Sequence, residues 1–108
     1  MKAWEIYTWN FPGAGPHPAV IISHPDRVKH KPQVNVLLCS SQRANRIAQA
    51  NEVMLDAADG LDWETLVKCD LIYAVDKTQL SPKRGEVIKE RRRQIAERIV
   101  KCLALAEV

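Results

Sequence analysis

Several side chains in the first half of the chain are of types that can move protons or contact a phosphate. His17 follows a stretch rich in glycine and proline, and the hydroxyl pair Ser40 and Ser41 ends an apolar run, with Gln42 and Arg43 directly after it. When RNA is cleaved by attack of its own 2′-hydroxyl, the reaction needs a base, an acid for the departing 5′-oxygen and donors to the charged phosphorane. A histidine, a serine and an arginine lining one groove would meet these needs without a metal ion.

The same residues also fit ordinary structural roles. His17 can cap a turn, Ser40 can hydrogen-bond the backbone at a strand end, and Arg43 can be solvated. Spacing alone favours these structural roles over a catalytic one. No phosphate-binding loop, dinucleotide fingerprint, zinc-protease motif or nucleophile elbow is present, so those classes of enzyme lack their signatures.

Metal binding has little support in the sequence. His17, His24 and His30 lie in predicted loops, at spacings that would not bring three imidazoles together. The three cysteines are widely spaced and form no CxxC pair, which argues against a zinc knuckle and a disulfide framework. We therefore expect no metal and no cofactor, and interpret the cysteines as small core residues.

Positive charge is concentrated in two parts of the chain. The formal net charge is only +3, but Arg27, Lys29 and Lys31 cluster around His30. A second cluster occupies the C-terminal third and comprises Lys83, Arg84, Lys89, Arg91, Arg92 and Arg93. Such clusters suit a polyanion, although a solvated helix face is the commoner explanation of a run of lysine and arginine.

The elements that must position these residues are mostly strands. Five short segments, most of them rich in β-branched and aromatic residues, predict strands at residues 3–9, 19–23, 34–39, 52–55 and 66–75, where 66–67 and 71–75 are separated by a stretch that can form a bulge. No segment between them is long enough for a crossover helix, and the polar stretch 24–32 predicts no element. We expect a mainly β protein with some α (α+β), whose sheet is largely antiparallel and curled into a small barrel.

The C-terminal part of the chain predicts one amphipathic helix. Its expected span is about Glu86 to Leu105, with an entrance at Ser81 and Pro82. The apolar positions that form a stripe on one side of this helix, and that we expect to pack on the sheet, are Ile88, Ile95, Ile99, Cys102 and Leu103. The basic residues on its other face would be solvated.

Length and composition place limits on the protein class. At 108 residues the chain predicts a single domain over 1–108, and its 46% apolar and 27% charged residues are typical of a folded globular protein. It contains no apolar run long enough to cross a membrane and no signal-peptide core at its start. We therefore expect a cytoplasmic protein that does not insert into membranes.

The order of several segments resembles the MazF/PemK family of toxin–antitoxin growth inhibitors over nearly the whole chain. The family's "G-x-R-P-x-x-V-I-S" stretch is similar to Gly15–Ser23, in which His17 replaces the arginine, and its "P-I-T-S" strand end is similar to the segment that ends in Ser40 and Ser41. The other matching segments are Glu5–Phe11, Gly60–Leu61, Thr65–Ile72, Val75–Lys77 and Gly85. The second half carries the most specific match, with Leu71 standing where the family usually has glutamine.

This resemblance implies a fold, an activity and partners. Family members are dimeric SH3-like barrels of the CcdB/MazF type that cut single-stranded RNA, such as mRNA, without a metal and are silenced by a small acidic antitoxin. By position, His17 would take the place of the catalytic arginine and Ser40 that of the catalytic threonine. The residues expected to bind RNA are Arg27, Lys29, Ser41, Gln42 and Arg43. We therefore expect a homodimeric endoribonuclease toxin.

Replacement of the arginine leaves other functions open. A guanidinium holds a phosphate through two hydrogen bonds and is always charged, whereas an imidazole titrates near neutral pH and suits acid–base work. A nuclease with an altered mechanism is the leading hypothesis. The alternatives are an inactive barrel that grips a protein, as gyrase-poisoning relatives of the same fold do, and a module that binds RNA without cutting it.

Overall fold

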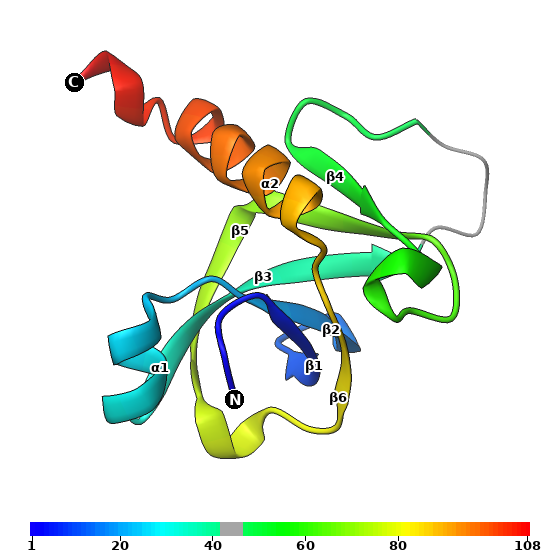
Figure 1. Ribbon diagram of the computed structural model, residues 1–108, viewed down its shortest axis with the longest axis vertical. Coiled ribbons are helices and arrows are strands. Elements are labelled where there is room, and N and C mark those ends of the chain that lie inside the picture. The colour runs from blue at the N-terminus through cyan, green and yellow to red at the C-terminus, as the bar shows by residue number, and fades with distance from the viewer. Residues whose placement is uncertain (42–46) are drawn as a thin grey trace.

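Six strands and two α-helices make up the fold in a computed structural model, which describes residues 1–41 and 47–108 (Figure 1). The strands are β1 (Glu5–Phe11), β2 (Gly15–Ile21), β3 (Gln33–Ser41), β4 (Glu52–Leu55), β5 (Thr65–Asp76) and β6 (Lys83–Glu86). The α-helices are α1 (Pro25–His30) and α2 (Lys89–Cys102). Three 3₁₀ turns complete the described elements: η1 (Ala57–Asp59), η2 (Lys77–Gln79) and η3 (Leu105–Glu107).

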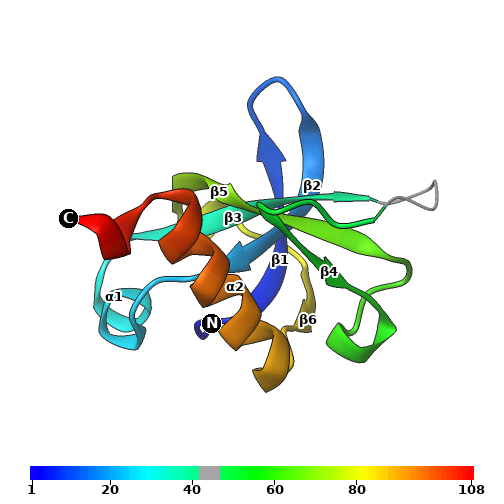
Figure 2. The same ribbon diagram turned by 90° about the horizontal axis from the view of Figure 1, so that it is seen from above.

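All strands join one sheet in the order β4-β5-β3-β2-β1-β6, and every neighbouring pair is antiparallel. The sheet is strongly curled, with β4 and β6 at its two edges, so it forms a half-barrel (Figures 1 and 2). A turn joins β1 to β2, while longer connections lead to the other strands. The expected α+β fold with a curled antiparallel sheet is therefore confirmed.

Both faces of the sheet carry buried side chains, because successive side chains along each strand point to opposite faces. On β2 and β3, Val20 and Leu37 belong to one core, while Ala19 and Val36 belong to the other. The first core also contains Cys39 and Cys69, and burial raises the pKa of the Cys69 thiol to about 12. These two cysteines are core residues, as predicted.

Helix α2 crosses the sheet over β4 and β5 (Figures 1 and 2). Ile95 is fully buried in the first core and Ile99 packs against it. The helix begins and ends three residues inside the predicted span, because the residues up to Glu86 pair with β1 and because Ala104 adopts a left-handed conformation with φ 52°. Leu103, predicted to be core, lies beyond the helix and is 44% exposed.

One α-helix and one β-strand were missing from the prediction. The stretch expected to have no element contains α1, which His24 caps by accepting from the Asp26 N–H and which buries Val28. Ser81 and Pro82, predicted to begin a helix, instead precede strand β6, which pairs with β1.

Among the described residues, no helix is long and apolar enough to cross a membrane.

Candidate functional site

The candidate site lies where β2 and β3 separate. The paired register of these strands ends at Ala19 and Leu38. Beyond that pair, the β1–β2 hairpin projects from the sheet, whereas β3 continues alongside β5 (Figure 2). We call this divergence the fork. His17 and Ser40 each lie two residues past the last pair, about 7 Å along their strands, and on the same face of the sheet.

The histidine at the fork is fixed by its own hairpin. His17 is half-buried and pairs across the hairpin with Trp9. Its Nε2 lies 3.1 Å from the carbonyl oxygen of Ala14, which can only accept a hydrogen bond. Nε2 therefore carries a proton, and in the neutral ring Nδ1 is the unprotonated nitrogen. An imidazole in this form can act as a base through Nδ1.

The serine on the other side of the fork is fixed by the sheet. Ser40 is half-buried and its Cα is paired with that of Leu66 on β5. Its neighbour Cys39 is fully buried in the first core, so alternation turns the Ser40 hydroxyl to the opposite face, which is also the face of Leu38. The strand thus presents a hydroxyl donor on the same face of the sheet as His17.

Aromatic rings cover the sheet next to the fork. Trp9 lies 4.6 Å from Phe11 and 5.6 Å from Tyr73 between ring centroids, and the Phe11 ring lies 6.5 Å from that of His17. Trp9 and Tyr73 are half-buried, so part of each ring remains accessible. The Trp9 indole N–H donates to the side-chain oxygen of Gln79 at 3.4 Å. These rings offer a surface on which a nucleotide base can stack.

Sequence reasoning missed this aromatic surface, although a signal for it was present. Tyr7, Trp9 and Phe11 alternate along β1, and alternation places them on a single face of the sheet. The contribution of Tyr73 from β5 could not be foreseen, because it depends on the pairing of β5 with β3.

The other predicted RNA-binding residues fall into two groups. Arg27 and Lys29 are exposed on α1, which follows the far end of β2 from His17, and the structure does not bring them to the fork. Ser41 continues β3 directly from Ser40, with its backbone paired to that of Thr65. Gln42 and Arg43 lie outside the described residues.

The three histidines are also separated from one another. His17 is on β2, whereas His24 and His30 are at opposite ends of α1. Within residues 1–41 and 47–108, no three histidine, cysteine or carboxylate side chains gather in a way that could hold a metal ion.

The structural class is an open antiparallel half-barrel with one C-terminal helix. Comparison with known proteins identifies the family. Residues 2–103 match the family model described as the PemK-like, MazF-like toxin of type II toxin–antitoxin systems. Because the match covers nearly the whole chain, this protein belongs to that toxin family. The family expected from the sequence is confirmed.

Solved structures share the fold at low sequence identity. An endoribonuclease in complex with its cognate antitoxin, from a mycobacterial species, superimposes with a TM-score of 0.83 and 23% identity, covering 97% of this chain and 96% of the other. The Mycobacterium tuberculosis toxin MazF-mt6 gives 0.79 and 21%, covering 93% and 96%. A MazE–MazF structure from Deinococcus radiodurans gives 0.73 and 20%, covering 95% and 94%. No curated protein sequence matches the chain.

Proposed function

We propose that this toxin is an endoribonuclease that cuts single-stranded RNA at the fork without a metal ion. The observation that carries the proposal is the placement of His17 and Ser40 on one face, each two residues beyond the last β2–β3 pair. Two similar structures are described as endoribonucleases, one of them bound to its antitoxin, which supports the same activity here.

Each fork residue has a distinct task in the proposed reaction. Nδ1 of His17 accepts the proton of the RNA 2′-hydroxyl, whose oxygen forms a bond to the adjacent phosphorus while the bond from phosphorus to the 5′-oxygen breaks. The products are a 2′,3′-cyclic phosphate and a free 5′-hydroxyl. The Ser40 hydroxyl donates to a phosphate oxygen as charge develops on it. The proton that the leaving oxygen takes up comes from the protonated His17 or from water.

RNA would lie across the fork and onto the aromatic surface. Trp9 and Tyr73 would stack on the bases, while Ser41, Gln42 and Arg43 would contact the backbone of the strand close to Ser40. Arg27 and Lys29, on α1, would attract RNA through their positive charge. They would contact it only where the RNA extends along β2 as far as α1.

The decisive experiment measures cleavage of a defined single-stranded RNA by the purified protein in the presence of EDTA. His17→Ala should lower kcat/KM about a hundredfold or more, because general base catalysis contributes at least that much. Ser40→Ala should lower kcat with little change in KM. His30→Ala, which removes an exposed imidazole from α1, is the matched control and should retain wild-type activity.

Two results would contradict this mechanism in different ways. If His17→Ala cuts at the wild-type rate, the nuclease stands but His17 is not its base. If the wild-type protein binds its antitoxin and leaves RNA intact, the protein is an inactive barrel, and growth arrest without RNA fragments would then point to a protein target such as a topoisomerase.

We also propose that the toxin works as a cytoplasmic homodimer neutralised by a small acidic antitoxin. The formal net charge of +3 favours an acidic partner. The mycobacterial relative was solved with its cognate antitoxin, and the Deinococcus relative with MazE. An open reading frame for a small acidic protein beside this gene, whose product abolishes RNA cleavage at a stoichiometric ratio, would support the pairing.

A further inference from the structure

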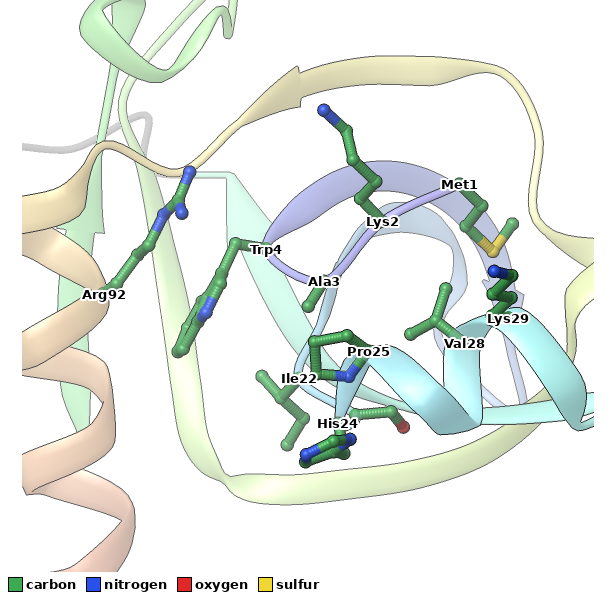
Figure 3. A pocket seen from close by; sticks show the side chains of 11 residues that line it. Met1, Lys2, Ala3, Trp4, Ile22, His24, Pro25, Val28, Lys29 and Arg92 are labelled. Carbon is green, nitrogen blue, oxygen red and sulfur yellow. The ribbon is translucent and has the colours of Figure 1, made fainter.

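A cavity of about 620 Å³ lies at the far end of β2 from His17. Four parts of the chain surround it: the first four residues, the link from β2 to α1, helix α1 itself and the first turn of α2 (Figure 3). Nothing in the proposed cleavage reaction uses this cavity. Its volume falls within the range of about 300–1,000 Å³ that is common for small-molecule sites.

Apolar side chains form most of the cavity wall. They are Met1, Ala3, Trp4, Ile22, Pro25 and Val28. In Figure 3, Ile22, Pro25 and Val28 form one side, and the Trp4 indole stands beside them. Val28 is almost completely buried, whereas Met1 is 45% exposed, so the wall is fixed at the side of α1 and open at the N-terminus.

The charged groups that line the cavity are all basic. Lys2 and Lys29 are exposed, and Arg92 reaches the cavity from α2 beside Trp4 (Figure 3). Arg92 also donates to Glu86 at 2.9 Å and to the carbonyl oxygen of Val87 at 2.7 Å, which fixes its guanidinium in place. None of the described lining residues carries a carboxylate.

The backbone at Trp4 adopts a conformation that favours glycine. Its φ is 71°, which is costly for a bulky side chain. Two backbone hydrogen bonds hold it there, from the Trp4 N–H to Ile21 at 2.7 Å and from the Val87 N–H to the Trp4 carbonyl at 2.9 Å. A tryptophan at such a position contributes an indole wall that glycine, the unstrained choice, would not provide.

We propose that this cavity binds a small amphipathic anion, with an aromatic or branched aliphatic body and a single carboxylate or sulfonate group. The body would lie against Trp4, Ile22 and Val28, and the acid group would lie at the open side of the cavity, where the exposed Lys2 and Lys29 supply positive potential. Four parts of the chain border one compact volume that is open at the N-terminus, and this shape suits a small molecule better than an extended peptide, which needs a long groove or a free strand edge.

The test follows the three indole N–H signals of ¹⁵N-labelled protein by NMR while naphthalene-1-acetate is added. Signals from Trp4, Trp9 and Trp63 are assigned with single phenylalanine variants. We expect saturable binding with a submillimolar Kd that moves the Trp4 signal and leaves the other two in place. The uncharged analogue naphthalene-1-acetamide should bind at least tenfold more weakly.

Matched variants test the role of the basic rim. The double variant Lys2→Gln with Lys29→Gln should weaken binding of naphthalene-1-acetate at least tenfold, whereas Lys31→Gln, at an exposed lysine that does not line the cavity, should leave Kd unchanged. Ala3→Phe should abolish binding by filling the cavity. His17→Ala should bind as the wild type does, so the result does not depend on RNA cleavage.

Several outcomes would overturn the proposal. These are the absence of a saturable shift at Trp4, equal shifts at all three indoles, or equal affinity for the acid and the amide. Displacement of naphthalene-1-acetate by an acidic, leucine-containing peptide that binds more tightly than the small anion would also overturn it, because the cavity would then be a protein-docking surface.

Discussion

Asp59 is a buried carboxylate in η1. Its carboxylate accepts hydrogen bonds from the backbone N–H groups of Asp56 at 3.0 Å and Ile88 at 2.9 Å, and it forms an ion pair with Arg91. Arg91 also pairs with Asp56, and these hydrogen bonds hold the pKa of Asp56 below its usual range. This arrangement attaches the start of α2 to the loop before β5.

Replacing Asp59 with asparagine should therefore destabilise the protein strongly. The NH₂ of the new side chain would face backbone N–H groups, which are also donors, and Arg91 would lose its buried charged partner. We expect the free energy of unfolding to fall by about 3 kcal/mol. Urea unfolding followed by circular dichroism measures the loss. Asp62→Asn, at an exposed carboxylate three residues further on, is the control and should change stability by less than about 0.5 kcal/mol. Equal stability of the two variants would show that the ion pair holds nothing in place.

Glu5 makes the stability of the folded state depend on pH. Burial opposes its ionisation, but the Lys83 ammonium at 2.6 Å, the Lys2 backbone N–H and the Tyr7 hydroxyl together hold the pKa of the Glu5 carboxyl below its usual range. A carboxyl whose pKa is lower in the folded than in the unfolded state stabilises the protein at pH values above its pKa in the unfolded state. That stabilisation is lost as the pH falls through the folded value.

We expect the free energy of unfolding to fall below about pH 5 in the wild type and to fall less in Glu5→Gln over the same interval. The two curves should approach each other at low pH, because protonated glutamate and glutamine are alike in charge. Lys83→Gln removes the main cation and should move the loss of stability to higher pH. Parallel curves for wild type and Glu5→Gln from pH 7 to pH 3 would contradict this account.

Among the elements, β6 depends on a close approach that only glycine allows. A Cβ atom added at Gly85 would overlap the carbonyl oxygen of Asp59, which is backbone and cannot swing away. Gly85→Ala should therefore push β6 from η1 and β1, at a cost of about 2–4 kcal/mol. Gly13→Asn is a useful control, because its Cβ meets nothing within 4 Å and asparagine tolerates the φ of 75° at that turn. Thermal unfolding of both variants checks the prediction.

The close contact between Gly85 and Asp59 also shows why some elements could be predicted from the sequence and others could not. Strand Glu52–Leu55 was predicted at its observed bounds because a short apolar run, Val53–Leu55, follows a polar stretch of the chain. The segment Lys83–Glu86 contains no β-former and is a strand only because the edge of β1 and the space beside Asp59 accept it. Helix α1 likewise depends on a distant contact, since Lys77 donates to the carbonyl oxygen of Val28 at 2.7 Å.

The candidate site divides in the same way. A histidine after a turn and a serine at a strand end can be identified from the sequence, and so can the alternating aromatic residues of β1. The fork cannot, because it depends on where the pairing of β2 and β3 ends. For the same reason, charge alone grouped Arg27 and Lys29 with the site, whereas β2 separates α1 from His17.

At the scale of the whole molecule, the C-terminal end of α2 leaves apolar surface uncovered. Val100 and Leu103 are 40% and 44% exposed, and Leu105 in the following turn is 50% exposed. The sequence places Leu103 in the apolar stripe of the helix, yet the sheet of the same chain does not cover it. Apolar side chains grouped in this way are typical of a surface that meets another protein.

A second copy of the chain is the partner we expect on this surface. Sedimentation equilibrium should give a dimer for the wild type, and Val100→Lys combined with Leu103→Lys should give a folded monomer, because burying two ammonium groups opposes association while both positions tolerate charge when exposed. Thr78→Lys, at an exposed residue of η2 at the other end of the molecule, is the control and should remain dimeric (Figure 1). If the double variant stays dimeric with unchanged affinity, the two copies meet elsewhere, and the exposed end of α2 is left for the antitoxin.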